Sequence, residues 1–335
     1  MRWTCLLPAI LLASTTMASA TSHAEPPPSP PSAPTATVDL PPALGPCRRS
    51  GHLPPRSATV QTLPSVAPEL TSLDIIAPRR EGDCAAAPVV IWAHGGGWAR
   101  GDKANGMDDK VAFFVDQLGY VLVSVNHRLS PWPPRPKDSA RVKHPAHVDD
   151  VVRAIRYVGA HVAEFGGDPA RLALLGHSSG AQLVALIGAD PERLSEAVGP
   201  SATIRCIGSY DGSYDVEGEV AAAPEGSPRR AVLVNAFGDS PSAWRDASPL
   251  ARSLVGFGVP LVQTARRGAW ARRSQHDRFV ERVRAAGASV DIIDATALDH
   301  EEIQRSLGAP GSVMMKAVEA FMGRCFEAAT EPAGR

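Results

Sequence analysis

One serine in this chain lies in a setting typical of a nucleophile. Gly176-His-Ser-Ser-Gly180 fits the pattern G-x-S-x-G, directly after an apolar run at 171–176 and directly before an apolar segment at 181–187. A strand that passes straight into a helix makes a turn so tight that its flanking residues must be small, and the turn exposes the serine hydroxyl. The N-terminus of the helix also favours developing negative charge. The pattern therefore predicts that Ser178 is a nucleophile.

Three consecutive glycines follow another apolar run, in the sequence His94-Gly-Gly-Gly-Trp98. Glycines leave backbone N–H groups open to a substrate oxygen, and acyl transfer needs such donors for its alkoxide intermediate. We predict that Gly96 and Gly97 are donors, together with the N–H of Ser179. A phosphate-binding loop is the alternative, but no G-x-x-x-x-G-K-[ST] pattern accompanies these glycines. The histidine that begins the loop is expected to hydrogen-bond within it, and the tryptophan that ends it to pack beneath it.

A serine nucleophile needs a histidine that takes its proton and passes it to the leaving group. In a strand–turn–helix setting this histidine follows the nucleophile in sequence, beyond the last strand. Only His276 and His300 follow Ser178. His276 falls at the start of an expected helix and is predicted to lie at the surface, whereas His300 comes just after the run at 289–293. We therefore predict that His300 is the general base.

The carboxylate that completes such a triad is missing from its usual place. The loop after the run at 260–264 is Ala-Arg-Arg-Gly-Ala-Trp-Ala-Arg-Arg-Ser (265–274), which contains no Asp or Glu. We select Asp211, because a carboxylate at the end of the preceding strand can also reach the histidine. Other carboxylates in the region are Asp215, Asp239, Asp294, Asp299, Glu301 and Glu302. A dyad that uses water or a backbone carbonyl is a further alternative, and it should be slower, since the acid orients the imidazole and stabilises its charged form.

Short apolar runs are expected to form the strands that carry these residues. They lie at 88–93, 120–125, 171–176, 203–208, 260–264 and 289–293. Such runs suit strands that are buried on both faces of a parallel sheet, and a further run at 73–76 is predicted at the antiparallel edge. Helical periods separate them, most clearly at 148–165 and 279–286. The sequence thus predicts an α/β class fold, a doubly wound, mostly parallel sheet with helices on both faces, and the irregular segment 212–258 is a candidate flap.

The composition bounds the domain organisation and the partners. Of 335 residues 44% are hydrophobic, and 34 basic side chains nearly balance 35 acidic ones. The hydrophobic residues are therefore sufficient to form a core, and the small net charge does not favour nucleic acid or an anionic membrane as a partner. Residues 1–20 are predicted to be a secretory signal peptide, 21–60 a proline-rich linker and 61–330 the catalytic domain. We expect an exported protein, periplasmic or secreted, that uses no metal or organic cofactor.

Export would leave four cysteines in an oxidising compartment, Cys47, Cys84, Cys206 and Cys325. They allow two disulfides in three connectivities, and free buried thiols are the alternative. None of the spacings resembles a zinc site.

Together the motifs resemble the α/β-hydrolase superfamily, and most closely its carboxylesterase and lipase-like branch, which includes hormone-sensitive-lipase-like and feruloyl-esterase-like bacterial enzymes. The resemblance runs from about Pro88 to Phe326. It is carried by 94–98, 126–129, Pro145 with Asp149, 165–171, 176–181, Tyr214-Asp215 and Ser248-Pro249. The resemblance implies that Ser178 is the nucleophile and His300 the base of a serine esterase that cleaves short-acyl or aryl carboxylic esters. The acid position of the family, near Gly268, is empty.

Two other functions stay open. The His-Gly-Gly-x-Trp pattern is also similar to that of kynurenine formamidases, which cleave an aryl formamide, although a signal peptide argues against that intracellular role. A non-catalytic binding protein with the same fold is favoured by the missing acid and opposed by the intact serine motif, glycine loop and histidine. Trp132, Trp244 and Trp270 are candidates for an acyl or aryl pocket, and the absence of a long apolar lid segment argues against long-chain substrates.

Overall fold

The computed structural model describes residues 46–64, 66–200, 202–254, 259–266 and 270–327. All of them belong to one unit of the chain, Leu44–Arg335. The predicted signal peptide and the first part of the predicted linker lie outside the described residues, so both stay predictions. None of the helices in the described ranges combines the length and the apolar character that a membrane span requires.

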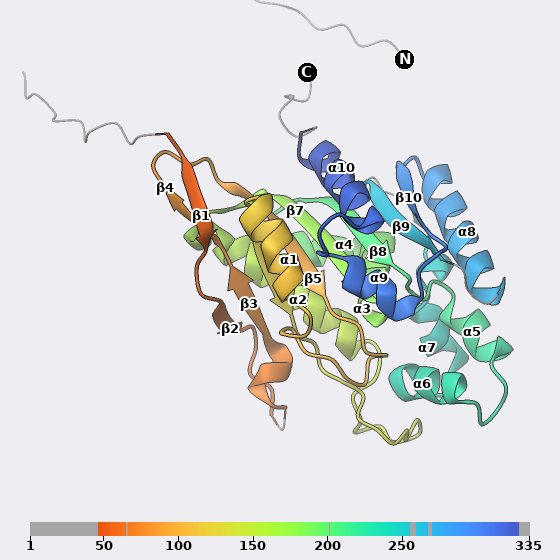
Figure 1. Ribbon diagram of the computed structural model, residues 1–335. Coiled ribbons are helices and arrows are strands. Elements are labelled where there is room, and N and C mark those ends of the chain that lie inside the picture. The colour runs from red at the N-terminus through yellow and green to blue at the C-terminus, as the bar shows by residue number, and fades with distance from the viewer. Residues whose placement is uncertain (1–45, 65, 201, 255–258, 267–269, 328–335) are drawn as a thin grey trace, which may run out of the picture. The chain divides into compact units, whose positions relative to one another are not determined.

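One sheet of eight strands forms the centre of the described structure (Figure 1). In sheet order the strands are β10 (Val290–Ala295), β9 (Leu261–Arg266), β8 (Ile204–Tyr210), β7 (Gly167–His177), β5 (Ala87–Ala93), β6 (Val121–Val125), β3 (Ser72–Ile76) and β2 (Arg56–Thr59). The strands from β10 to β6 run parallel to one another, and β3 and β2 pair antiparallel. The six parallel strands coincide with the six apolar runs, and the predicted fold class is confirmed.

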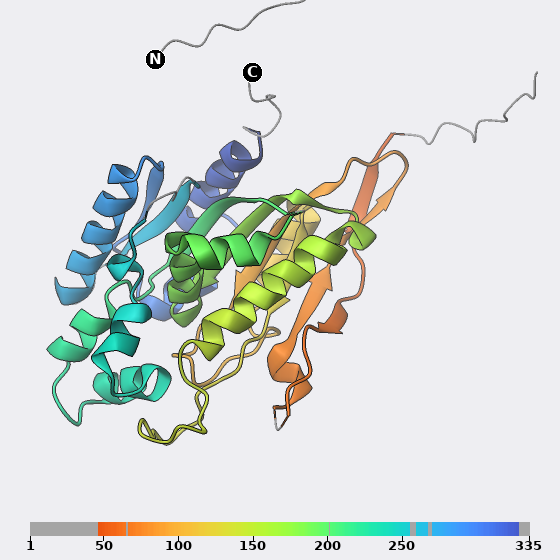
Figure 2. The ribbon, with the colours of Figure 1, turned by 180° about the vertical axis from the view of Figure 1, so that it is seen from behind.

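Alternate side chains of the strands enter two separate cores, one on each face of the sheet. In β5, for example, Val89 and Ile91 lie in the first core, whereas Val90 and Trp92 lie in the second. The first core is covered by α2 (Ala146–His161), α3 (Ser179–Ala189), α4 (Pro191–Val198) and α8 (Trp270–Ala285), and the second by η2 (Val111–Gln117), α9 (His300–Ser306) and α10 (Val313–Glu327). Figure 1 shows the second group in front of the sheet, and Figure 2 shows α2, α3 and α4 from behind.

The apolar stripe predicted at 148–165 becomes α2 and a short 3₁₀ helix, Val162–Phe165. Val151, Ile155 and Val158 are fully buried on its inner face. Gly166 ends the helix with a φ of +74°, a left-handed conformation that glycine adopts without a steric penalty.

The N-terminal part of the described chain differs from the expected linker. Residues 48–52 form strand β1, which pairs with β4 (Pro78–Glu81) in a two-stranded antiparallel ribbon. Strand β2, also predicted as linker, adds to the outside of β3, so β3 is not the edge of the sheet as we expected. The prolines lie between β1 and β2, where no ladder hydrogen bond is needed. Long-range pairing therefore orders a segment whose composition alone indicates an extended chain.

One of the three cysteine connectivities is partly realised. Cys47 and Cys84 form a disulfide with a Cα–Cα distance of 4.7 Å, which joins the chain before β1 to the chain after β4 at one end of the ribbon. Cys206 and Cys325 are free thiols, and both are buried in the second core.

The irregular segment 212–258 contains the short helices α5 (Val216–Ala222), α6 (Pro228–Phe237) and α7 (Pro241–Asp246). Proline at the first helical turn begins both α6 and α7, where its missing N–H costs no hydrogen bond. Residues of α5 and α6 line the cavity described below, so the segment covers part of the site as a flap would.

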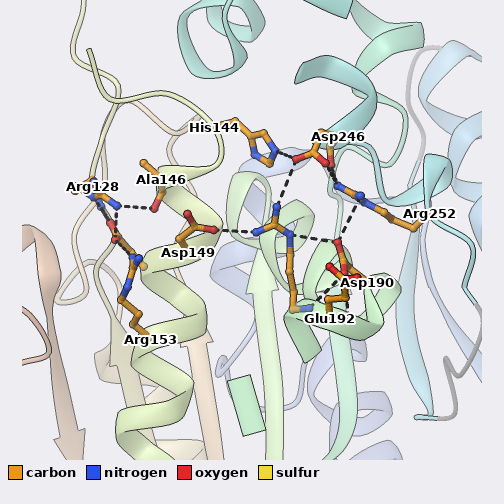
Figure 3. A network of polar contacts seen from close by, with 11 residues as sticks. Arg128, His144, Ala146, Asp149, Arg153, Asp190, Glu192, Asp246 and Arg252 are labelled. Atoms are coloured by element: carbon orange, nitrogen blue, oxygen red, sulfur yellow. Dashed lines mark hydrogen bonds and ion pairs between the residues drawn. The ribbon is translucent and has the colours of Figure 1, made fainter. Parts of the chain in front are cut away.

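A network of charged side chains joins α2, α4 and α7 (Figure 3). Asp246 accepts hydrogen bonds from His144 Nε2 at 2.7 Å and from Arg252 Nη2 at 2.6 Å. Arg193 bridges Asp246 to Asp149, which lies in α2. The hydrogen bond from His144, followed by the hydrogen bond and charge of Arg252, holds the pKa of Asp246 well below its usual range, although burial opposes this.

We predict that Asp246→Asn lowers the Tm by about 2–4 °C at pH 7, a size that fits about 1 kcal/mol for a partly exposed ion pair. A carboxyl whose pKa is depressed by folding stabilises the protein above its unfolded-state pKa and loses this contribution as the pH falls. The difference in Tm between variant and wild type should therefore shrink below about pH 4. Thermal unfolding from pH 7 to pH 3, with the exposed Asp239→Asn as control, measures this. A pH-independent difference would contradict it.

Candidate active site

The turn between β7 and α3 places Ser178 in a conformation that few residues other than glycine adopt. Its φ is +57° and its ψ is −118°. The two flanking glycines leave no room for a side chain: a Cβ on Gly176 would lie 2.6 Å from the backbone of Gly180, and one on Gly180 would lie 2.1 Å from the carbonyl oxygen of Ala93. The turn is therefore as tight as the motif predicts, and the serine side chain lines a cavity.

Ser178, His300 and Asp211 form one hydrogen-bonded chain. The Ser178 hydroxyl lies 2.8 Å from His300 Nε2, and His300 Nδ1 lies 2.5 Å from Asp211 Oδ2. The Asp211 side chain is buried, whereas that of His300 is 27% exposed. With Nδ1–H donated to the carboxylate, Nε2 carries the lone pair that can accept the serine proton. The structure thus brings together the three residues that the sequence nominated for this chain.

Asp211 follows the last residue of β8 and has a φ of +53°. Asparagine and aspartate tolerate this left-handed region better than most residues. Its backbone N–H donates to Thr264 Oγ1 at 3.0 Å, so the neighbouring strand β9 fixes the turn that carries the carboxylate.

The other candidate carboxylates have different positions. Asp215 caps the N-terminus of α5, and Asp299 forms a capping box with Glu302 at the start of α9. The side chain of Asp294 bonds to Thr296, Asp239 is exposed, and Glu301 lines the cavity. The position near Gly268, where the acid was expected, lies outside the described residues.

His276 is buried, and our prediction of a surface position was wrong. Helix α8 begins at Trp270, so His276 lies within the helix and on its inner side. Its Nε2 hydrogen-bonds to the carbonyl oxygen of Gly212 at 3.1 Å, and its ring packs edge-on against Tyr214.

The glycine loop after β5 is tightly folded and lines the cavity. Gly96 and Gly97 have φ values of +127° and +61°, and a Cβ on Gly96 would lie 2.0 Å from the carbonyl oxygen of Arg100. As expected, His94 hydrogen-bonds within the loop, from Nδ1 to the carbonyl oxygen of Gly95 at 2.8 Å. Trp98 is buried, and its Nε1–H donates to Gln182 in α3 at 3.0 Å. Ser179, the third proposed donor, is the first residue of α3.

Buried histidines support this loop from behind, which the sequence analysis did not predict. The rings of His94 and His127 stack with their centroids 4.6 Å apart, and His147 meets His127 edge-on. Burial, together with the neighbouring His94, lowers the pKa of His127 to about 3, so this ring is neutral at physiological pH. Neutral stacked rings can pack closely behind the loop without charge repulsion.

A cavity of about 1250 Å³ opens at the proposed nucleophile. Its floor includes the glycine loop, Ser178 and His300. The residues that line it include the polar Arg100, Asn105 and Gln304. The region from α5 to α6 contributes both apolar and charged residues, namely Ala222, Pro224, Val232, Glu219 and Arg229. Trp132 lines it and is 58% exposed. Trp244 instead bonds to the Gly238 carbonyl oxygen, and the side chain of Trp270 lies outside the described part.

The described residues contain no group of three histidine, cysteine or carboxylate side chains that could hold a metal ion. The cavity contains the hydrogen-bonded serine and imidazole, and the glycine loop lines it as well.

Comparison with known proteins adds three findings. The family model described as BD-FAE matches residues 73–250. Esterase LipC of Mycobacterium tuberculosis is 30% identical over 220 residues, which are 63% of this chain and 52% of LipC. The kynurenine formamidase-like hydrolase fscH of Fusarium equiseti is 31% identical over 196 residues, 53% of this chain and 63% of that protein. The chain thus spans about half the length of LipC.

Among solved structures, a thermostable esterase from Pseudomonas putida ECU1011 superposes with a TM-score of 0.61 at 21% identity, covering 82% of each chain. A structural similarity at this level of sequence identity is evidence for a shared fold alone.

Proposed function

The chain belongs to the BD-FAE family and has the α/β-hydrolase fold, and from this premise we propose that it is a carboxylic ester hydrolase that forms an acyl-enzyme on Ser178. The observation that carries the proposal is the chain of hydrogen bonds from Ser178 through His300 to Asp211 at the floor of a cavity. The relatives that are named esterases support the same reaction class.

In the proposed mechanism, His300 Nε2 takes the proton of the Ser178 hydroxyl as its oxygen attacks the ester carbonyl. Asp211 accepts from Nδ1–H and stabilises the imidazolium that results. The N–H groups of Gly96, Gly97 and Ser179 donate to the oxyanion, and one such donor is typically worth about 10²–10³ in rate. His300 then protonates the departing alcohol. In the second half of the reaction His300 takes a proton from water as the water attacks the acyl carbonyl, and it returns that proton to the Ser178 oxygen when the acid is released.

We propose short-acyl or aryl esters as substrates. The apolar residues of the α5–α6 region that line the cavity include Ala222, Pro224 and Val232, and the charged Glu219 and Arg229 of the same region line it as well. Charged side chains among these apolar residues are a poor match for a long alkyl chain, because burial of each CH₂ contributes about 0.8 kcal/mol only where an apolar surface receives it.

Hydrolysis of p-nitrophenyl acetate, butyrate and octanoate tests the proposal, with Ser178→Ala measured beside the wild type. We expect turnover that requires Ser178 and a kcat/KM that is lower for octanoate than for acetate or butyrate. A kcat/KM that rises steadily to octanoate would contradict the short-acyl assignment.

An aryl formamide is the second candidate substrate, because a formamidase-like hydrolase is among the relatives. The same residues could cleave an amide, with His300 protonating the departing amine. Comparing kcat/KM for N-formylkynurenine and p-nitrophenyl acetate decides between the two, and we expect the ester to be the better substrate.

We also propose that the protein is exported. The cleavage pattern at residues 18–20 and the disulfide between Cys47 and Cys84 both fit an oxidising compartment. The mass of the mature chain recovered from outside the cytoplasm would locate the cleavage site.

A further inference from the structure

We propose that His177 is a positioning residue: it holds the backbone of His300 so that the His300 ring can bridge Ser178 and Asp211. This inference rests on the proposed function, since it assigns a role within the same reaction. His177 is the first variable residue of the G-x-S-x-G motif and directly precedes the nucleophile.

A direct contact joins His177 to the residue it is proposed to hold. His177 Nε2–H donates to the backbone carbonyl oxygen of His300 at 2.9 Å, although the two residues lie 123 positions apart in sequence. Their rings also pack together, with centroids 4.6 Å apart and planes inclined by 40°. His177 is buried, at 1% exposure, so both contacts are shielded from water. The last residue of β7 thereby touches the proposed base and adjoins the proposed nucleophile.

The protonation state of His177 suits this role. Burial is the largest effect and, with the neighbouring His300, lowers the pKa of His177 to about 3; Lys110 acts in the same direction and Asp211 in the opposite one. A neutral ring has a single N–H, and the contact with the carbonyl oxygen assigns it to Nε2. The His177 ring therefore stays neutral when His300 becomes charged during the reaction, and the two rings do not repel each other.

The surroundings leave His300 few other ways to shift. Its ring is held by Ser178 and Asp211, and the preceding residue, Asp299, is fixed by the capping box of α9. On the other side of the His177 ring, a Cβ on Gly95 would come within 3.2 Å of Nδ1, so the glycine leaves space for the imidazole. The hydrogen bond from His177 holds the His300 carbonyl from outside helix α9.

Two substitutions separate the hydrogen bond from the packing. His177→Phe keeps a ring of similar shape but removes the donor, and His177→Gln keeps an N–H near the position of Nε2 but removes the ring. His144→Phe is the matched control, because His144 is also a buried, hydrogen-bonded histidine but lies in the charged network around Asp246. For each variant we would measure Tm, kcat, KM, and kcat/KM against pH with p-nitrophenyl acetate.

We expect His177→Phe to lower kcat about tenfold or more with KM within about twofold, because a small displacement of a base costs rate rather than substrate binding. The acid limb of the pH profile should move to lower pH, since a looser contact with Asp211 stabilises the charged imidazole less. His177→Gln should restore most of kcat. His144→Phe should lower Tm alone.

The proposal is overturned if His177→Phe has the wild-type kcat and pH profile, or if it changes only Tm, as the control does. A proton NMR signal from the His300–Asp211 hydrogen bond provides a readout that needs no turnover. It should shift or disappear in His177→Phe and stay in His144→Phe; an unchanged signal in both contradicts the positioning role. Absence of Ser178-dependent hydrolysis in the wild type would instead overturn the proposed function, and the NMR comparison would still decide on His177.

Discussion

Ser178→Ala is expected to lower kcat for p-nitrophenyl acetate by about 10⁴–10⁶-fold, with a much smaller effect on KM. The hydroxyl oxygen is the atom that forms the acyl-enzyme, and the hydroxyl is hydrogen-bonded to His300 Nε2 at 2.8 Å. Without it the remaining groups can only orient water and stabilise the oxyanion, which in comparable enzymes leaves a small fraction of the rate. Initial-rate kinetics on the purified variant measure the loss.

Ser72→Ala is a suitable control for this substitution. Ser72 is also buried, and its hydroxyl donates to the carbonyl oxygen of Glu69 at 2.7 Å, near the opposite edge of the sheet from β10. The control should keep the wild-type kcat. If Ser178→Ala kept most of the rate as well, Ser178 would have no part in the chemistry.

Asp211→Asn should lower kcat by about 10³–10⁴-fold, the second largest effect we expect. Asparagine preserves shape and tolerates the φ of +53° at this position, so the fold should survive. Its amide group, however, can donate to His300 Nδ1, which favours the tautomer with the proton on Nε2 and prevents that nitrogen from accepting the serine proton. The contact at 2.5 Å is the structural basis for this expectation.

Asp239→Asn provides the comparison, because Asp239 is exposed and lies in the irregular segment that follows Asp211. We expect its kcat to stay within about twofold of the wild type, as for most surface substitutions. If Asp239→Asn were the slower variant, Asp211 would be the wrong carboxylate.

The parts of the site that sequence reasoning located are those set by local geometry. The turn at Ser178 needs small neighbours at Gly176 and Gly180 because the backbone atoms of adjacent segments occupy the space of a side chain. Buried parallel strands likewise appear as apolar runs, which placed β5, β7 and β8 and thus the ends from which the glycine loop, Ser178 and Asp211 project. The choice of Asp211 followed from the order of strands, since the usual acid position was empty.

The features that sequence reasoning missed depend on contacts between distant segments. Nothing near residues 48–59 indicates that β1 pairs with β4 or that β2 pairs with β3. The position of His276 depended on where α8 begins, which is at Trp270 and well before the apolar period at 279–286. The contact between His177 and His300 spans 123 positions, and the stacked histidines behind the glycine loop come from three separate segments. A single sequence carries no local pattern for any of these.

Labelling with a fluorophosphonate, followed by peptide mass mapping, tests the central claim most directly. The claim is that Ser178 is a nucleophile activated by His300 and Asp211. We predict a single adduct on the peptide that contains Ser178, no adduct in Ser178→Ala, and much slower labelling in His300→Ala and Asp211→Asn. A folded wild-type protein that acquires no adduct, or acquires it on another residue, would contradict the claim and favour a hydrolase fold that only binds its ligand.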